Sequence, residues 1–206
     1  RITFICGGPI ASSSSPYPVS LRERILLYLD EHHNEIERNS VVAESFSDYF
    51  QKGQYSNLLQ FEEDIANVAS LIVICLESAG SLVEFGLFCN HASTADKLLV
   101  YIPEEHYDGV DSFIALGPLA QLKANSSKSV LAYPFPDPSK SVYEDIDLVV
   151  GDLTEKLESN QSAFKKPRAP HLDGSKCSYP KIETSIIILQ LMVQIQVMHV
   201  TLPLTK

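Results

Sequence analysis

Two glutamates stand at positions from which a carboxylate could serve a binding or catalytic site. Glu84 falls in the first turn of a helix expected to begin near Leu82, and Glu62 falls among the apolar positions of an earlier expected helix. A carboxylate that faces a core needs a partner or a ligand. Each also has an ordinary explanation, because Ser81-Leu82-Val83-Glu84 matches a capping box and Glu62 could reach solvent from the edge of its apolar stripe. Both interpretations stay open at this point.

Two turns should bring further candidates close to these glutamates. Gly7-Gly8 follows the first expected strand, and Glu77-Ser78-Ala79-Gly80-Ser81 follows a later one. Glycines let a ligand approach the backbone closely, and the start of a helix offers N–H groups to a phosphate. The candidate substrate-binding residues of these turns are Gly7, Gly8, Glu77, Ser78, Gly80 and Ser81.

Two charged residues could add to the same site from neighbouring segments. Glu44 follows the second expected strand, where nucleotide-binding folds commonly carry an acid that binds ribose hydroxyls. Arg22 could reach a phosphate from the first turn of the first helix. A solvated acid and a surface salt bridge are the ordinary alternatives for these two side chains.

The sequence lacks the motifs of several other enzyme classes. It contains no G-x-x-x-x-G-K-[ST] and no G-x-S-x-G, so P-loop hydrolysis and serine acyl transfer have no support. The histidines at 32, 33 and 106 lack spaced companions, and the four cysteines show no zinc spacing. We therefore expect neither a metal ion nor a resident cofactor.

The elements that position these residues alternate between short strands and helices. Apolar, β-branched runs predict strands over residues 2–6, 40–43, 71–76, 97–102 and 129–133. Helical spacing predicts helices from residue 21, behind a Ser20–Glu23 capping box, over residues 58–69, from about residue 82, and over residues 142–157. This alternation predicts a doubly wound, flavodoxin- or Rossmann-like α/β fold with a five-stranded parallel sheet and helices on both faces. In the order 2-1-3-4-5 the third strand is central, and the two turns face each other across a crevice.

Composition bounds the domain organisation and the partners. A chain of 206 residues, 45% of them apolar, supports one α/β domain over residues 1–160. A formal net charge of −10 argues against a surface that wraps nucleic acid. Residues 161–206 are expected to form a basic, proline-containing linker and an atypical apolar tail, which could be a truncated C-terminal region. Glutamines interrupt the tail, so it is a poor membrane span, and without a signal peptide we expect a cytoplasmic protein.

Several stretches resemble the nucleoside deoxyribosyltransferase-like effectors of bacterial retron systems. These stretches are residues 2–8, residues 58–66 and residues 73–86, and the last contains E-S-x-G-S-x-x-E-x-G. The similarity continues through residues 97–100, 112–118 and 125–131, so that it covers about residues 2–135. Order and spacing carry it more than any single motif.

The resemblance implies roles for the candidate residues. In the deoxyribosyltransferases, a glutamate in the helix after the central strand attacks the anomeric carbon of the sugar, and the motif puts this role on Glu84. With Glu62 as the second catalytic residue, the resemblance implies an N-ribosidase that hydrolyses NAD or a related nucleotide. A carboxylate at a helix start has a lowered pKa, so we expect Glu84 to be ionised.

The resemblance also implies a biological setting. Such effectors act as toxins in anti-phage defence and are restrained by a reverse transcriptase with its RNA–DNA hybrid. Glu77-Ser78 stands where deoxyribosyltransferases usually carry an aspartate, and residues 165–206 do not match the winged-helix region of many family members. A nucleotide-sensing module without turnover and a nucleoside deoxyribosyltransferase stay open as alternatives, as does a homo-oligomer.

Overall fold

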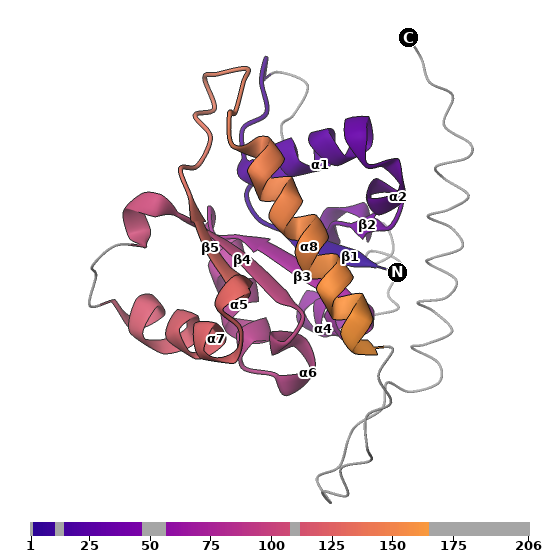
Figure 1. Ribbon diagram of the computed structural model, residues 1–206, viewed down its shortest axis with the longest axis vertical. Coiled ribbons are helices and arrows are strands. Elements are labelled where there is room, and N and C mark those ends of the chain that lie inside the picture. Colours follow the sequence, from indigo (N-terminus) through magenta and orange to yellow (C-terminus); the bar gives the residue numbers. More distant parts are fainter. Residues whose placement is uncertain (1, 11–14, 47–56, 108–111, 165–206) are drawn as a thin grey trace, which may run out of the picture. The chain divides into compact units, whose positions relative to one another are not determined.

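Five parallel strands form the centre of the computed structural model, which describes residues 2–10, 15–46, 57–107 and 112–164 (Figure 1). They lie in the order β2-β1-β3-β4-β5, and every neighbouring pair is parallel. The strands are β1 (Thr3–Cys6), β2 (Ser40–Val41), β3 (Leu71–Cys75), β4 (Leu98–Pro103) and β5 (Val130–Tyr133). The predicted fold class and strand order are confirmed, with β3 in the middle of the sheet.

Helices follow or precede each strand. The longer ones are α1 (Leu21–His32), α4 (Leu58–Val68), α5 (Ala79–Cys89) and α8 (Ile146–Phe164). The shorter ones are α2 (Asn34–Glu37), η1 (Ala43–Phe46), α6 (Ala92–Ala95), η2 (Glu104–His106), the π-helical η3 (Ala115–Leu119), α7 (Ala120–Asn125) and η4 (Ser127–Ser129). The second strand is shorter than predicted, because the chain turns into η1 at Ala43.

Two helix boundaries differ from the prediction for identifiable reasons. α5 begins three residues before Leu82, because the side chain of Ser78 caps it. α8 begins at Ile146 rather than at Val142, which is 70% exposed. The apolar side chains of α8 that are buried against the sheet begin only at Val149.

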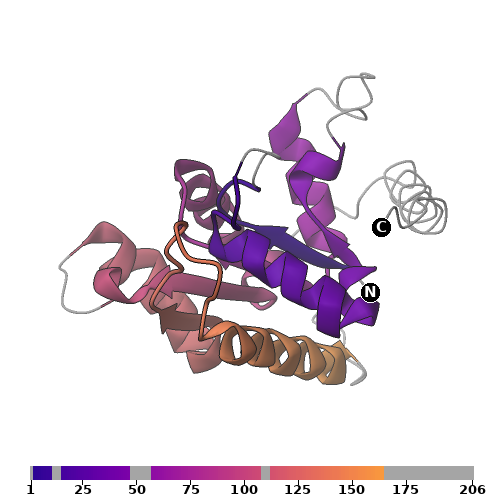
Figure 2. The same cartoon turned by 90° about the horizontal axis from the view of Figure 1, so that it is seen from above.

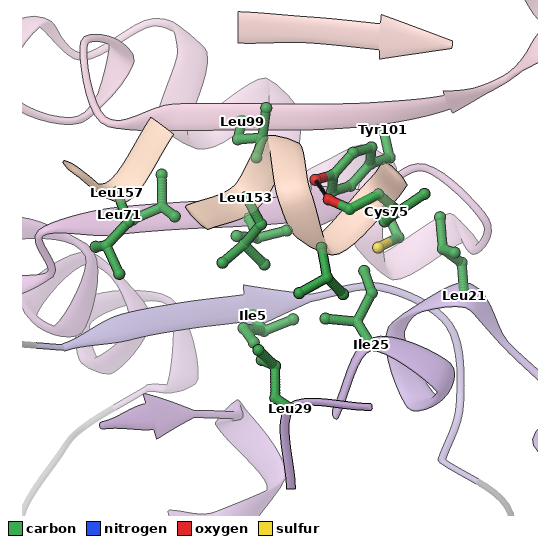
Figure 3. Packing of buried hydrophobic residues seen from close by; sticks show 13 residues of the cluster. Ile5, Leu21, Ile25, Leu29, Leu71, Cys75, Leu99, Tyr101, Leu153 and Leu157 are labelled. Carbon is green, nitrogen blue, oxygen red and sulfur yellow. Dashed lines mark hydrogen bonds between the residues drawn. The ribbon is translucent and has the colours of Figure 1, made fainter. Parts of the chain in front are cut away.

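One face of the sheet is covered by α1 and α8. Figure 2 shows these two helices on one side of the strands and α4 on the other. Ile5, Ile25 and Leu153 belong to the buried cluster on this face (Figure 3). The hydroxyl of Tyr101 in this cluster donates to the carbonyl of Val149 at 2.7 Å, which joins β4 to α8.

The other face carries the side chains that alternate with this cluster. The ring of Phe4 meets the ring of Phe88 from α5 edge-on, with centroids 6.1 Å apart. Because successive side chains of a strand point to opposite faces, Cys6 lies on the same face as Phe4. The end of β1 therefore presents a buried thiol to the side on which α4 and α5 lie.

A buried arginine ties two loops together at the carboxyl edge of the sheet. Arg24 in α1 is 5% exposed, and its guanidinium donates to four backbone carbonyls. One carbonyl belongs to Pro18, before α1, and the others belong to Asp137, Lys140 and Ser141, between β5 and α8. We call this arrangement the Arg24 clamp.

Part of the predicted organisation falls on residues 165–206, outside the described residues. This part includes most of the linker and the whole apolar tail, so the domain boundary stays a prediction. Across the residues that the structure describes, no helix combines the length and the apolar character needed to cross a membrane.

Candidate functional site

Five side chains from five different elements lie within electrostatic reach of one another at the carboxyl ends of β1 and β3. They are Cys6 at the end of β1, Arg22 in α1, Glu44 in η1, Glu62 in α4 and Glu84 in α5. We call these five residues the carboxylate cluster. β1 and β3 are neighbours from which the chain leaves in opposite directions, and such switch points hold the ligand sites of open α/β sheets.

Glu62 is a buried acid in the carboxylate cluster. It is only 9% exposed, so it faces the sheet and does not reach solvent from the edge of α4. Burial, followed by the negative charges of Glu84 and Glu44, raises its pKa from 4.5 to about 7. Near neutral pH Glu62 therefore populates both protonation states, as a group that accepts or donates protons requires.

Glu84 does not cap its helix. The N-cap of α5 is Ser78, and the capping box is closed by Ser81, which leaves Glu84 as the sixth residue of the helix. The capping interpretation of Glu84 is therefore wrong. The pattern Ser81-Leu82-Val83-Glu84 imitates a capping box one turn inside the helix.

The surroundings of Glu84 act on its pKa in opposite directions. Burial raises the pKa of Glu84, while the positive charge of Arg22 and a hydrogen bond from the Cys6 thiol lower it. The net direction is upward, so the expected lowering by the helix start is wrong. The helix dipole acts within the first turn, and Glu84 lies beyond it in a half-buried position.

Arg22 and Glu44 form a two-pronged ion pair beside these glutamates. Nη2 and Nη1 of Arg22 donate to the two carboxylate oxygens of Glu44 at 2.7 and 3.1 Å. Arg22 is 4% exposed whereas the Glu44 side chain is 59% exposed, so the pair joins a buried cation to a carboxylate that faces solvent. The Nε of Arg22 has no hydrogen-bond partner among the described residues. Burial would raise the pKa of Glu44, but the hydrogen bonds and charge of Arg22 hold it below its usual value.

Glu77 binds backbone rather than standing free for a ligand. Its carboxylate accepts from the N–H groups of Gly8 at 2.8 Å, Leu21 at 2.8 Å and Arg22 at 3.1 Å. A Cβ added at Gly7 or Gly8 would come within 2.9 Å of Glu77 atoms. The close approach that the two glycines allow is therefore used by Glu77, contrary to the expectation that they leave room for a ligand.

The two serines of the second turn hold the start of α5 in place. Ser78 Oγ accepts from the Ser81 N–H at 3.1 Å and donates to the Gly7 carbonyl at 3.1 Å, which links the two turns directly. Ser81 is fully buried, and its hydroxyl accepts from the Ser78 N–H at 3.1 Å. Gly80 is exposed in the first turn of α5, with no atom closer than 3.8 Å to an added Cβ.

Two features of this region could not be read from the sequence. The hydrogen bonds of Glu77 and the thiol of Cys6 both depend on strand neighbours that lie far away along the chain. Within the described ranges, no group of three or more His, Cys, Asp or Glu side chains could hold a metal ion.

Comparisons with known proteins show which family the chain belongs to. The family model described as "STM3845 retron effector protein" matches residues 18–204. The chain belongs to this retron effector family. The predicted resemblance to retron effectors is thereby confirmed.

Two curated relatives of this effector come from Escherichia coli. The effector is 30% identical to "Retron Ec86 putative ribosyltransferase/DNA-binding protein" over 129 residues, which cover 62% of this chain and 39% of the relative. It is 25% identical to "Retron Ec73 putative ribosyltransferase/DNA-binding protein" over 179 residues, which cover 81% of this chain and 53% of the relative. The chain thus spans between about two fifths and about half of the length of these curated relatives.

Proposed function

We propose that this retron effector cleaves the N-glycosidic bond of NAD or a related nucleotide, with the carboxylate cluster as its active site. The observation that carries the proposal is a pair of glutamates in unlike surroundings. Burial and neighbouring carboxylates raise the pKa of Glu62 to about 7. Burial also raises the pKa of Glu84, but there the charge of Arg22 and the hydrogen bond from the Cys6 thiol oppose it. Two neighbouring carboxyl groups in different surroundings are the equipment that glycoside hydrolysis uses.

The chemistry assigns one step to each glutamate. When the bond to nicotinamide breaks, the nicotinamide leaves with the bonding electron pair, and positive charge develops at the anomeric carbon. In its ionised form, Glu84 stabilises that charge or bonds to the carbon, as a carboxylate does in retaining sugar hydrolysis. Water then bonds to the same carbon, any bond to Glu84 breaks with its electron pair returning to the carboxylate, and a proton of the water passes to ionised Glu62. The products are ADP-ribose, nicotinamide and one proton.

The ion pair between Arg22 and Glu44 limits the negative charge of the site. With this pair neutral, the net charge of the cluster is negative and comes from the ionised forms of Glu84 and Glu62. A site of this charge favours a cationic pyridinium substrate over a neutral one. The candidate substrate-binding residues around it are Arg22 and Glu44, with the two turns Gly7-Gly8 and Glu77 to Ser81 as their support.

Family membership supports the biological part of the proposal. A retron effector of this kind would deplete the nucleotide in infected cells and be restrained by the retron reverse transcriptase with its RNA–DNA hybrid. Both relatives carry "ribosyltransferase" in their names. Transfer of the sugar to an added free base would convert the same site from hydrolysis to transferase chemistry.

The purified chain without other retron components tests the proposal. We expect release of nicotinamide from NAD, measured by chromatography, and a loss of about 10²-fold or more in Glu84→Gln. Glu63→Gln, on the same helix as Glu62 but outside the cluster, is the matched control and keeps the wild-type rate. No release from the wild type, or equal release from Glu84→Gln, contradicts the assignment. A new nucleoside formed with added free base identifies transfer.

A further inference from the structure

The first turn of α1 has no backbone donor left for a phosphate. The N–H groups of Leu21 and Arg22 donate to Glu77, and the N–H of Glu23 donates to the hydroxyl of the N-cap Ser20 at 3.0 Å. The next N–H, that of Arg24, makes the first bond within the helix, to the Ser20 carbonyl. The Gly8 N–H, which points into the same space, is also held by Glu77.

Side-chain atoms also fill the space above this turn. Atoms of the Glu77 side chain lie within 2.9 Å of the Cβ positions of both Gly7 and Gly8. Arg22 and Ser20 contribute their own Cβ atoms at 2.8 and 2.9 Å to the same positions. A phosphate at this turn would have to displace an anchored carboxylate, and it would meet that carboxylate's negative charge.

We propose that Glu77 is a specificity-determining residue that occupies, from inside the fold, the anion position of the β1–α1 turn and keeps the phosphates of the substrate away from α1. In folds with this connectivity, the glycine turn after the first strand and the following helix start form a ready phosphate site. Here the chain supplies its own anion, whose two oxygens take three of the N–H donors that a phosphate would use.

Glu77 also positions the cationic residue of the carboxylate cluster. Its bond to the Arg22 N–H fixes the backbone from which the guanidinium extends to Glu44. One carboxylate thus closes the turn to phosphate and holds the first turn of α1 against the end of β1. A nucleotide bound at the cluster must direct its phosphates elsewhere.

Titration with inorganic phosphate tests this inference on the full chain. We expect the amide resonances of Gly8, Leu21 and Arg22 in the wild type to stay unmoved as phosphate is added at constant ionic strength. In Glu77→Ala the carboxylate is removed, so we expect a lower Tm in chloride than for the wild type. We expect phosphate or formate to restore part of this Tm loss in a saturable way, and phosphate to bind about tenfold more tightly, or more, than to the wild type.

Two variants serve as controls. Glu77→Gln keeps the side chain in place and so blocks phosphate, and we expect no recovery by either anion. Glu155→Ala removes an exposed carboxylate that pairs with Lys128, and we expect its Tm to respond to anions as the wild type does. If Glu77→Ala does not fold, the wild-type titration decides alone.

Two results overturn the inference. One is a saturable phosphate shift of the Gly8, Leu21 and Arg22 amides in the wild type. The other is a folded Glu77→Ala that neither recovers in phosphate or formate nor binds phosphate more tightly than the wild type. The inference rests on the proposed function only in naming a nucleotide as substrate. Because binding and Tm need no turnover, its failure is distinct from failure of the NAD assay.

Discussion

Glu62 and Glu84 carry the same carboxyl group but have different neighbours at the end of the sheet. Burial and neighbouring carboxylates raise the pKa of both residues, but at Glu84 the Arg22 charge and the Cys6 thiol oppose this effect. The difference between these two residues comes from elements distant in sequence. Cys6 lies 78 positions before Glu84. It ends β1, which pairs with β3, the strand that precedes the helix of Glu84.

The pH dependence of NAD cleavage tests the role of Glu62. If ionised Glu62 takes the proton from water, kcat/KM rises as the pH increases through about 7, the pKa of this group. Glu62→Gln lacks that titration, and we expect a lower rate, by about 10²-fold, with a flat profile across this range.

The control for this measurement is Glu63→Gln, which should retain the wild-type profile. A rate that falls as the pH rises through 7 would instead show that protonated Glu62 is the active form. That outcome contradicts the role of Glu62 as the group that takes the proton from water, and it assigns Glu62 as a proton donor instead.

At the residue scale, the candidate side chains could be predicted from the sequence more fully than the partners that they contact. The apolar positions around Glu62 indicated burial as one of two open interpretations, and the structure favours it. The pairing of Arg22 with Glu44 could not be predicted, because the two residues come from different elements that meet only when β2 pairs with β1. For Glu77, the predicted role in ligand binding gave way to a role in binding the backbone.

α5 owes its starting point to two serines rather than to its glutamate. Ser78 caps the helix and also donates to Gly7 across the two turns. Ser81 is buried beneath it. The helix start and the position of the candidate nucleophile are therefore set by different residues, which can be changed separately.

Opposite effects on stability should separate these two roles. We expect Ser78→Ala to lower the free energy of unfolding by about 1 kcal/mol, because it removes the N-cap. Glu84→Gln should leave it unchanged or raise it near pH 8. The pKa of Glu84 is raised in the folded chain, so its contribution to stability is present below pH 4.5 and is lost as the pH rises through the folded pKa.

Urea denaturation measures both changes. Ser93→Ala, at an exposed position in α6, is the matched serine control and should stay within about 0.5 kcal/mol of the wild type. A loss in Glu84→Gln as large as that in Ser78→Ala would contradict this separation of roles.

At the element scale, the strands were predictable because each is a short apolar run that ends at a turn or a proline. Their order followed from the connectivity of alternating strands and helices. The start of α5 was missed because two overlapping patterns compete, one from Ser78 to Ser81 and one from Ser81 to Glu84. The contact of Ser78 with Gly7, in the turn that follows the neighbouring strand β1, favours the first.

The whole chain carries a formal net charge of −10 and belongs to a family of retron effectors. Under the proposed function, this chain acts beside an RNA–DNA hybrid, which is itself strongly negative. Like charges repel over distances of the order of the Debye length, so we expect no general electrostatic attraction of the chain to such a hybrid. We expect a partner protein or a local basic segment such as residues 165–168 to supply any contact.

Binding measurements at the scale of the whole molecule test this expectation. With a fluorescent RNA–DNA hybrid in about 0.15 M salt, we expect no saturable anisotropy change from the chain alone. Adding the retron reverse transcriptase should bring the effector onto the hybrid. Tight binding by the chain alone, with a steep dependence on salt, would contradict this prediction.

The Arg24 clamp has a consequence for how this edge of the sheet opens. Its guanidinium serves four carbonyls in two loops, so neither loop can leave without exposing a buried cation and several unpaired acceptors at once. Residues 134–141 and the segment entering α1 should therefore open as one cooperative unit, with amide protons that exchange with deuterium at a common rate. Entry to the carboxyl edge would then be an all-or-none event rather than the fraying of one loop.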